Sequence, residues 1–319
     1  MSLAPTAAQL SRAARLLTLR SRREANSVLG GTYTSAFRGG GIEFEELRPY
    51  LPGDDVRSLD WNATARSGAP FVRRFREERD RTLVLLLDVS ASMRFGVANR
   101  SKATLAAHLA ALLAAAAGRA GDRVGLVAFD DRVRDELLPQ SGPAHAWRVV
   151  RRAVAAAGRA GGGTGLAAAL ARLPRHTRRS AIVCLLSDFR DPALLPTPNG
   201  AGGDRPSARN AAGAALAAAC IRHDLVSVVL QDPREDELPA AGLVRFADPE
   251  QPRRTLALDT GDPRVRARYQ MASAARRRGL KRWLHAAGAD VLWIRSGEEP
   301  LRALVRFFRQ RTGRRELAG

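Results

Sequence analysis

The amino-acid sequence predicts an α/β fold with a doubly wound, mostly parallel sheet and helices on both faces. Short, continuously apolar runs such as 82–87 and 181–186 are typical of strands that are buried on both faces. Longer segments with helical periodicity, such as 101–120, lie between these runs. Because strands and helices alternate along the chain, the strands are expected to be parallel and joined by helical crossovers.

The expected elements follow one another from residue 82 onward. Strands are expected at 82–87, 123–129, 181–186, 225–230 and 290–294, with an antiparallel edge strand at 133–138. Helices are expected at 101–120 (with Ser101 as N-cap), 144–157, 165–173, 207–221 and 300–309. Two stretches interrupt this alternation. The Pro- and Gly-rich segment 191–210 is expected to form a long loop, and 244–258 contains two short strand-like runs that suggest a hairpin insertion.

The first 80 residues differ from the rest of the chain. Ser11–Arg23 has apolar residues at helical spacing, and Gly39–Gly41 predicts a turn. A polar, turn-rich segment follows at 43–78. We therefore expect an N-terminal helix and segment (1–80) packed on a main domain (81–319) that ends in a basic helical region.

Composition favours a soluble, cytoplasmic protein. Hydrophobic residues make up 45% of the 319 residues, which is enough for a full core. The longest apolar run, 105–117, is interrupted by His108 and is shorter than the roughly 20 residues that a transmembrane helix needs. The N-terminus has no compact apolar segment typical of a signal peptide. The two cysteines, Cys184 and Cys220, form no motif and fit a reducing compartment.

The net charge of +20 comes almost entirely from arginine, since only Lys102 and Lys281 are lysines. The charge is concentrated toward the C-terminus: residues 264–319 contain 15 basic and 4 acidic residues, a difference of +11. Such a region can form a solvated helical face, or it can bind nucleic acid, acidic lipid or an acidic protein. No zinc-ligand spacing or nucleic-acid-binding motif accompanies this charge.

Polar side chains with oxygen donors follow the expected strands where these end. In the segment Asp88-Val89-Ser90-Ala91-Ser92, alternate residues point the same way in extended backbone, so Asp88, Ser90 and Ser92 converge. Thr164 lies in a glycine-rich loop, and Asp188 follows the strand 181–186. The carboxyl ends of parallel strands are where open α/β sheets bind ligands. Oxygen donors alone suit a hard cation, Mg²⁺ first and Mn²⁺ as the alternative.

This order of residues resembles the metal-ion-dependent adhesion site of von Willebrand factor A domains. The resemblance implies that Ser90, Ser92 and Thr164 bind Mg²⁺ through their hydroxyls, and that Asp88 and Asp188 bind it directly or through water. One coordination position would then accept a carboxylate from a partner. Two alternatives compete with this interpretation. The serines can cap the next helix, or Asp88 can be a phosphatase nucleophile, although Ser90 replaces the second aspartate that such phosphatases need.

A second resemblance rests on the segment Leu47–Arg66, with Glu43 upstream and 75–78 downstream. It reads Leu-Arg-Pro-Tyr-Leu-Pro-Gly-Asp-Asp-Val-Arg-Ser-Leu-Asp-Trp-Asn-Ala-Thr-Ala-Arg. It resembles the signature of the bacterial family named "domain of unknown function 58", in which it precedes an adhesion-type A domain. The resemblance implies a MoxR-type AAA+ ATPase as partner. We expect ion pairs and the aromatic rings of Tyr50 and Trp61 to clamp the segment onto the main domain.

These observations predict a metal-dependent protein-interaction module, an adaptor or co-chaperone of a MoxR-type ATPase. Two other classes stay open: a Mg²⁺-dependent hydrolase and a basic binder of nucleic acid or anionic surfaces. Against an enzyme, the sequence has no phosphate-binding Gly-x-x-x-x-Gly-Lys loop and no assignable nucleophile–base pair. The five histidines are scattered singly along the chain.

Overall fold

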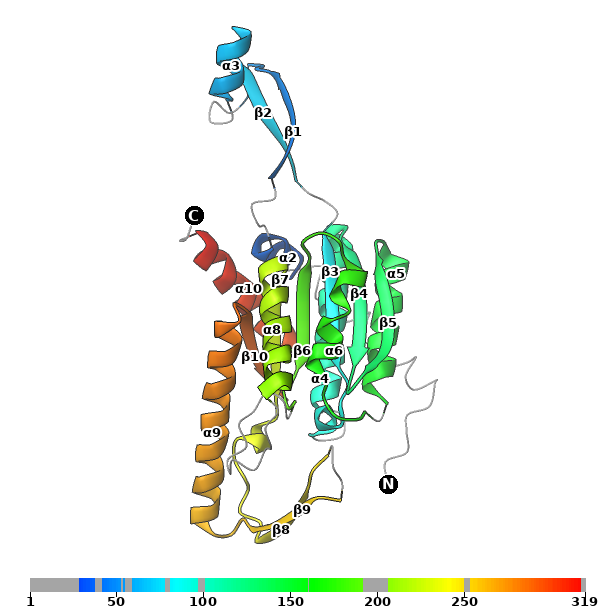
Figure 1. The fold of residues 1–319 in the computed structure, drawn as a ribbon, viewed down its shortest axis with the longest axis vertical. Coiled ribbons are helices and arrows are strands. Elements are labelled where there is room, and N and C mark those ends of the chain that lie inside the picture. Colours follow the sequence, from blue (N-terminus) through cyan, green and yellow to red (C-terminus); the bar gives the residue numbers. More distant parts are fainter. Residues whose placement is uncertain are drawn as a thin grey trace.

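A computed structural model describes residues 29–37, 42–52, 54, 59–77, 81–96, 101–159, 161–191, 206–249 and 253–316 (Figure 1). The helix expected at Ser11–Arg23 and the turn at Gly39–Gly41 lie outside the described residues, as do residues 192–205 of the expected loop.

Six strands form the central sheet in the order β10-β7-β6-β3-β4-β5. Their bounds are β3 (Thr82–Asp88), β4 (Arg123–Phe129), β5 (Val133–Gln140), β6 (Ile182–Ser187), β7 (Asp224–Gln231) and β10 (Asp290–Arg295). β5 pairs with β4 as an antiparallel edge strand, and the other neighbours are parallel. The predicted doubly wound, mostly parallel sheet is confirmed, including its antiparallel edge.

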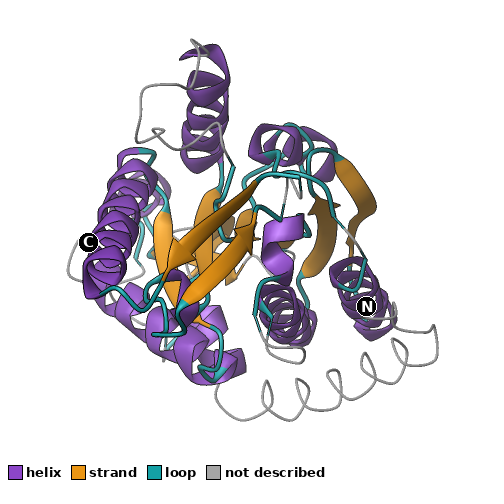
Figure 2. Cartoon of the chain, turned by 90° about the horizontal axis from the view of Figure 1, so that it is seen from below, coloured by secondary structure: helices purple, strands orange, loops and turns teal. Residues whose placement is uncertain are grey.

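Helices cover both faces of this sheet, as Figure 2 shows. Their bounds are α2 (Gly30–Ala36), α4 (Lys102–Ala120), α5 (Pro143–Ala157), α6 (Leu166–Leu170), α7 (Leu173–His176), α8 (Pro206–Arg222), α9 (Pro263–Ala286) and α10 (Pro300–Glu316). Alternate residues of β3 face opposite sides. Leu83, Leu85 and Leu87 share a core with α2, α4, α5 and α10, whereas Val84 and Leu86 share one with α6, α7, α8 and α9.

Three helices differ from their predicted extent. The helix expected at 165–173 is split into α6 and α7, because Pro174 fits only the first turn of a helix and α7 begins at Leu173. α10 continues past the expected residue 309 to Glu316. α9, with 24 residues, had no predicted bounds, since its many arginines hide the narrow apolar stripe formed by residues such as Leu280 and Leu284.

Among the described residues, α4 is the one helix long and apolar enough to cross a membrane by length and composition. Of its most apolar window, however, 67% is buried inside the structure. α4 begins where predicted: Ser101 is its N-cap, and the Ser101 hydroxyl accepts a hydrogen bond from the Thr104 N–H. It therefore serves as the central core helix on one face of the sheet.

The signature segment forms an arm built from β1 (Ile42–Pro49), α3 (Trp61–Ser67) and β2 (Phe71–Glu77). β1 and β2 pair antiparallel, and Asp60 caps α3. An ion pair of 2.7 Å joins Arg48 and Asp54 within the arm. Trp61 is 70% exposed and so does not clamp the segment as expected. In Figure 1 the arm extends beyond the end of the sheet where β3 begins.

A second hairpin lies at the opposite end of the molecule, beyond the carboxyl ends of the parallel strands (Figure 1). It consists of β8 (Leu243–Ala247) and β9 (Thr255–Asp259), which pair antiparallel and confirm the predicted insertion. Two short 3₁₀ helices, η3 (Ala91–Arg94) and η4 (Pro233–Glu235), follow β3 and β7 at this same end. The predicted site residues lie there too.

Candidate functional site

The site is built first on the segment that follows β3. Asp88 is the last residue of β3, and its Oδ1 accepts a hydrogen bond of 2.9 Å from the Ser90 N–H. The Ser90 and Ser92 hydroxyl oxygens lie 3.1 Å apart. All three side chains are buried. The backbone thus turns around the Asp88 carboxylate and brings both hydroxyls to one point.

The glycine-rich loop packs directly against this segment. The Ala91 N–H donates to the Gly162 carbonyl at 2.9 Å. A Cβ on Gly161 would lie 1.9 Å from the Val89 carbonyl oxygen, so glycine is required for this close approach. Thr164 belongs to the same loop and is itself buried. The loop therefore brings Thr164 to the same end of the sheet as the serines.

The neighbouring strand supplies the second carboxylate. Ser187 ends β6, and its hydroxyl donates to Asp88 Oδ2 at 2.5 Å. Asp188 follows directly, and its Oδ1 accepts a hydrogen bond of 3.1 Å from the Arg190 N–H. Since β3 and β6 are adjacent and parallel, their ends place Asp88 and Asp188 side by side. Asp88, Ser90, Ser92 and Asp188 thus form one buried cluster beside the loop of Thr164.

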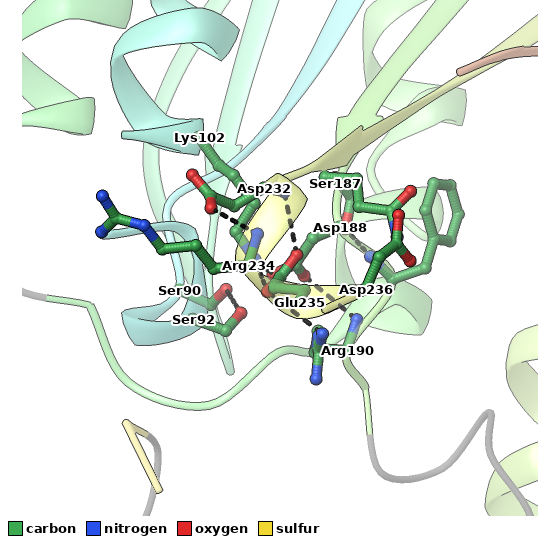
Figure 3. A network of polar contacts seen from close by, with 12 residues as sticks. Ser90, Ser92, Lys102, Ser187, Asp188, Arg190, Asp232, Arg234, Glu235 and Asp236 are labelled. Carbon is green, nitrogen blue, oxygen red and sulfur yellow. Dashed lines mark hydrogen bonds and ion pairs between the residues drawn. The ribbon is translucent and has the colours of Figure 1, made fainter. Parts of the chain in front are cut away.

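Sequence reasoning missed a cation that contacts this cluster at Asp188. The Lys102 ammonium is fully buried and lies 2.5 Å from Asp188 Oδ2 and 2.6 Å from Glu235 Oε1 (Figure 3). Lys102 is the first residue of α4, where the positive end of the helix dipole disfavours a cation. Its place there depends on the two carboxylates, which together carry one more negative charge than the ammonium neutralises.

Glu235 is held by its own capping interactions. It closes a capping box in η4, in which Glu235 Oε2 accepts from the Asp232 N–H at 3.1 Å. Its other oxygen, Oε1, also lies 3.1 Å from an Arg190 guanidinium nitrogen. The polar network therefore joins the start of α4, the end of β6 and η4, as Figure 3 shows.

Two signals in the sequence point to these missed residues. Lys102 is one of two lysines in a chain with 52 basic residues, and it stands at the start of a helix. Asp232-Pro233-Arg234-Glu235 has the spacing of a capping box directly after a predicted strand. Neither pattern indicates that the two residues meet, because they are 133 positions apart and only the sheet brings them together.

The two aspartates differ in their protonation. Burial, and then the neighbouring Asp188 carboxylate, raise the pKa of Asp88 to about 7. Burial alone would also raise the pKa of Asp188, but the Lys102 ammonium, together with Arg190 and the Ser92 hydroxyl, holds this pKa below its ordinary value. At neutral pH the Asp188 carboxylate is therefore ionised, whereas the Asp88 carboxyl lies near its pKa and exists in both protonated and ionised forms.

The donor set fits a hard divalent cation. Hydroxyl and carboxylate oxygens are the ligands that Mg²⁺ prefers. No cluster of three His, Cys, Asp or Glu side chains able to hold a metal occurs in the part of the chain that the structure describes. Any ion here would depend on the serine and threonine hydroxyls as well as on the two aspartates, as the resemblance implied.

A cavity beside Asp188 is lined by basic residues. Arg190, Arg276 and Arg277 line it together with Asp188 and Glu235. Arg276 is largely enclosed on α9, and burial followed by the charge of Arg190 lowers its pKa to about 10. Three guanidinium groups against two carboxylates leave this lining with an excess of positive charge, which favours an incoming anion.

The family described as "Protein of unknown function DUF58" matches residues 46–279. The chain belongs to this family. Uncharacterised proteins of Mycobacterium tuberculosis and Mycobacterium bovis are each 31% identical to it over 312 residues, covering 98% of this chain and 92% of theirs. The family resemblance stated from the signature segment is thereby confirmed. The central sheet is mostly parallel and doubly wound, as expected for a von Willebrand factor A-like fold.

The solved structures that match this chain share little sequence with it. BatB from Bacteroides thetaiotaomicron is 15% identical, with 73% of this chain and 99% of that chain covered and a TM-score of 0.41. The minor pilin PilB from Streptococcus sanguinis is 12% identical, with 78% and 65% covered and a TM-score of 0.40.

Proposed function

We propose that this DUF58 protein is a metal-dependent protein-interaction module that captures an acidic side chain of a partner protein in the cytoplasm. One observation carries the proposal: Asp88, Ser90, Ser92 and Asp188 converge in a buried cluster beside the loop of Thr164, at the carboxyl ends of adjacent strands. We assign no catalytic role to the site.

Different residues of the chain would hold the metal and attract the partner. The hydroxyls of Ser90, Ser92 and Thr164 would hold Mg²⁺, or Mn²⁺ in its place, with Asp88 and Asp188 binding directly or through water. A bound divalent ion supplies Lewis acidity, which attracts an anionic oxygen. Hydroxyl ligands are neutral, so they leave more of the ion's charge for a partner carboxylate. Arg190, Arg276 and Arg277 line the adjacent cavity and favour the same acidic partner.

We propose a MoxR-type AAA+ ATPase, or the protein that it remodels, as that partner. The support is the family itself together with the basic surroundings of the site, which suit an Asp or Glu side chain. Attraction by exposed arginines would speed the encounter, and salt would weaken this effect because screening acts within about 10 Å at 0.1 M.

The first test is metal binding by calorimetry. We expect one Mg²⁺ site in the wild type and a loss of at least tenfold in affinity in Thr164→Ala, since a hydroxyl ligand is removed. Thr312→Ala is the matched control, because the Thr312 hydroxyl bonds only to the Phe308 carbonyl within α10 in the described contacts. Equal affinity of all three proteins would place the ion elsewhere.

The second test is partner capture. Binding to a MoxR-type AAA+ ATPase from the same host is measured with Mg²⁺ and with EDTA. We expect the wild type and Thr312→Ala to form complexes that dissociate in EDTA. We expect Thr164→Ala to form no complex. A complex that survives both EDTA and Thr164→Ala would show that docking does not use this site.

A further inference from the structure

Lys102 occupies the place where a cation belongs. Its ammonium is fully buried, 2.5 Å from Asp188 Oδ2. The other oxygen of Asp188 accepts the Arg190 N–H at 3.1 Å, so both oxygens are engaged by donors of this chain. Asp188 is also one of the two carboxylates that the proposed Mg²⁺ needs. Lysine and metal therefore compete for one carboxylate.

The competition is electrostatic as well as geometric. An ammonium and a divalent ion that share one buried carboxylate repel each other, and low dielectric strengthens that repulsion. The ammonium has three donors and no acceptor, so it cannot itself become a ligand while it stays protonated. Among the described residues, its other ionic partner is Glu235, which holds it at 2.6 Å.

We propose that Lys102 competes with the divalent ion. The Lys102 ammonium holds Asp188 until the metal displaces the ammonium toward Glu235. This inference rests on the proposed metal site. It implies that the resting site is closed by an internal ion pair and that Lys102 sets a high threshold for Mg²⁺. It also couples the metal to η4, because the ammonium moves toward Glu235 when the ion binds and Glu235 belongs to η4.

A purely structural role of Lys102 makes a different prediction. The ion pair would then anchor α4 and η4 to the end of β6, and removal of the ammonium would destabilise the fold regardless of metal. A competitor also leaves buried carboxylates unpaired when it is removed, but Mg²⁺ can then neutralise them. The two roles differ in what Mg²⁺ does to a variant without the ammonium.

The experiment compares the wild type with Lys102→Met and Lys102→Gln, which both remove the charge, the second keeping a hydrogen-bond donor. Lys281→Met is the control, because Lys281 is the other lysine and is exposed on α9. Mg²⁺ affinity is measured by calorimetry at constant ionic strength, and Tm is measured with and without Mg²⁺. We expect affinity to rise by about tenfold or more in both Lys102 variants, since a like charge is removed, with a larger Mg²⁺-dependent rise in Tm. Lys281→Met should match the wild type.

Each outcome decides the question. Lys102 variants that fold only with Mg²⁺ support the competitor role. Mg²⁺ binding by these variants when the wild type binds no Mg²⁺ supports it too. Variants that bind Mg²⁺ no more tightly than a binding wild type overturn this inference and leave the metal site standing. Variants that stay unfolded at every Mg²⁺ concentration also overturn it, because the ammonium is then an anchor. No binding by any of the four proteins overturns both proposals.

Discussion

A lysine at position 102 has a physical reason in a chain whose basic residues, apart from Lys281, are otherwise arginines. The ammonium is a compact point charge that can donate in three directions, so it reaches Asp188 and Glu235 from one fully buried position. A guanidinium is larger and planar, and it would have to fit where Lys102 has no exposed surface. The choice of lysine therefore reflects the enclosed geometry between two carboxylates.

His145 shows how a buried residue makes stability depend on pH. Arg148 donates to His145 Nδ1 at 2.9 Å, so the neutral ring carries its proton on Nε2, which donates to the Val124 carbonyl at 2.8 Å. Burial, with a smaller contribution from Arg148, lowers the pKa of His145. Protonation on Nδ1 would place a proton against Arg148 and break this arrangement.

The sign follows from this lowered pKa. As pH falls through about 6.5, the ordinary pKa of histidine, His145 is protonated in the unfolded chain. In the folded chain it is protonated only at lower pH, so the folded state loses stability as pH falls. We predict that the stability advantage of the wild type over His145→Gln shrinks by up to about 1.4 kcal/mol between pH 7.5 and 5.5. Urea unfolding at both pH values measures it. Parallel pH profiles of the two proteins would contradict the prediction.

At the scale of elements, the glycine-rich loop must lie close to the backbone after β3. A Cβ on Gly161 would meet the Val89 carbonyl oxygen at 1.9 Å and Ser90 Cα at 2.8 Å. We predict that Gly161→Ala destabilises the fold by about 1–3 kcal/mol, the usual cost of overpacking, and weakens Mg²⁺ binding because the loop of Thr164 must retreat. Urea unfolding and calorimetry check both effects.

Gly279→Ala is the matched control for this loop. Nothing lies within 4 Å of a Cβ at Gly279, which sits within α9. Since alanine is the better helix former, this variant should be more stable than the wild type by up to about 1 kcal/mol. A Gly161→Ala protein as stable as Gly279→Ala would show that the loop can accommodate a Cβ at position 161.

The sequence predicts elements best where one local rule decides them. β3 and β6 read as buried strands because every residue between Leu83 and Leu87, and between Ile182 and Leu186, is apolar. Ser101 marks the start of α4 through capping alone. The grouping of Asp88, Ser90 and Asp188 was also predictable, because parallel strands end at one edge of a sheet.

Contacts between distant segments could not be predicted in the same way. The pairing of Lys102 with Glu235 depends on the position of η4, which follows from packing and not from a local pattern. The arm was expected to be clamped by aromatic rings, yet Asp60 caps α3 and Trp61 faces solvent. Its expected packing on the main domain stays a prediction, since the ion pair seen there, Arg48–Asp54, is internal.

At the scale of the whole molecule, the two ends of the described chain meet on one face of the sheet. α2, at the N-terminal side, packs on α10, at the C-terminal side, through Tyr33, Phe37 and Phe308. Arg311 adds charge to this contact: it pairs with Asp224 and Asp290, which begin β7 and β10, and lies over the Phe37 ring. This junction completes the core on the α4 face and lies far from the strand ends that carry the candidate site (Figure 1).

The aromatic junction should therefore govern stability without governing the site. Phe308 is 1% exposed, and Phe308→Ala should lower the free energy of unfolding by about 3–5 kcal/mol, because a large cavity replaces the ring. Trp61→Ala removes a larger ring that is 70% exposed, and it should change stability by no more than about 0.5 kcal/mol. Urea unfolding measures both. Mg²⁺ affinity of the folded proteins should equal that of the wild type in each case, because neither ring contacts the cluster of Asp88 and Asp188. A change of tenfold in the affinity of folded Phe308→Ala would instead show that the core transmits the state of the α2–α10 junction to the strand ends.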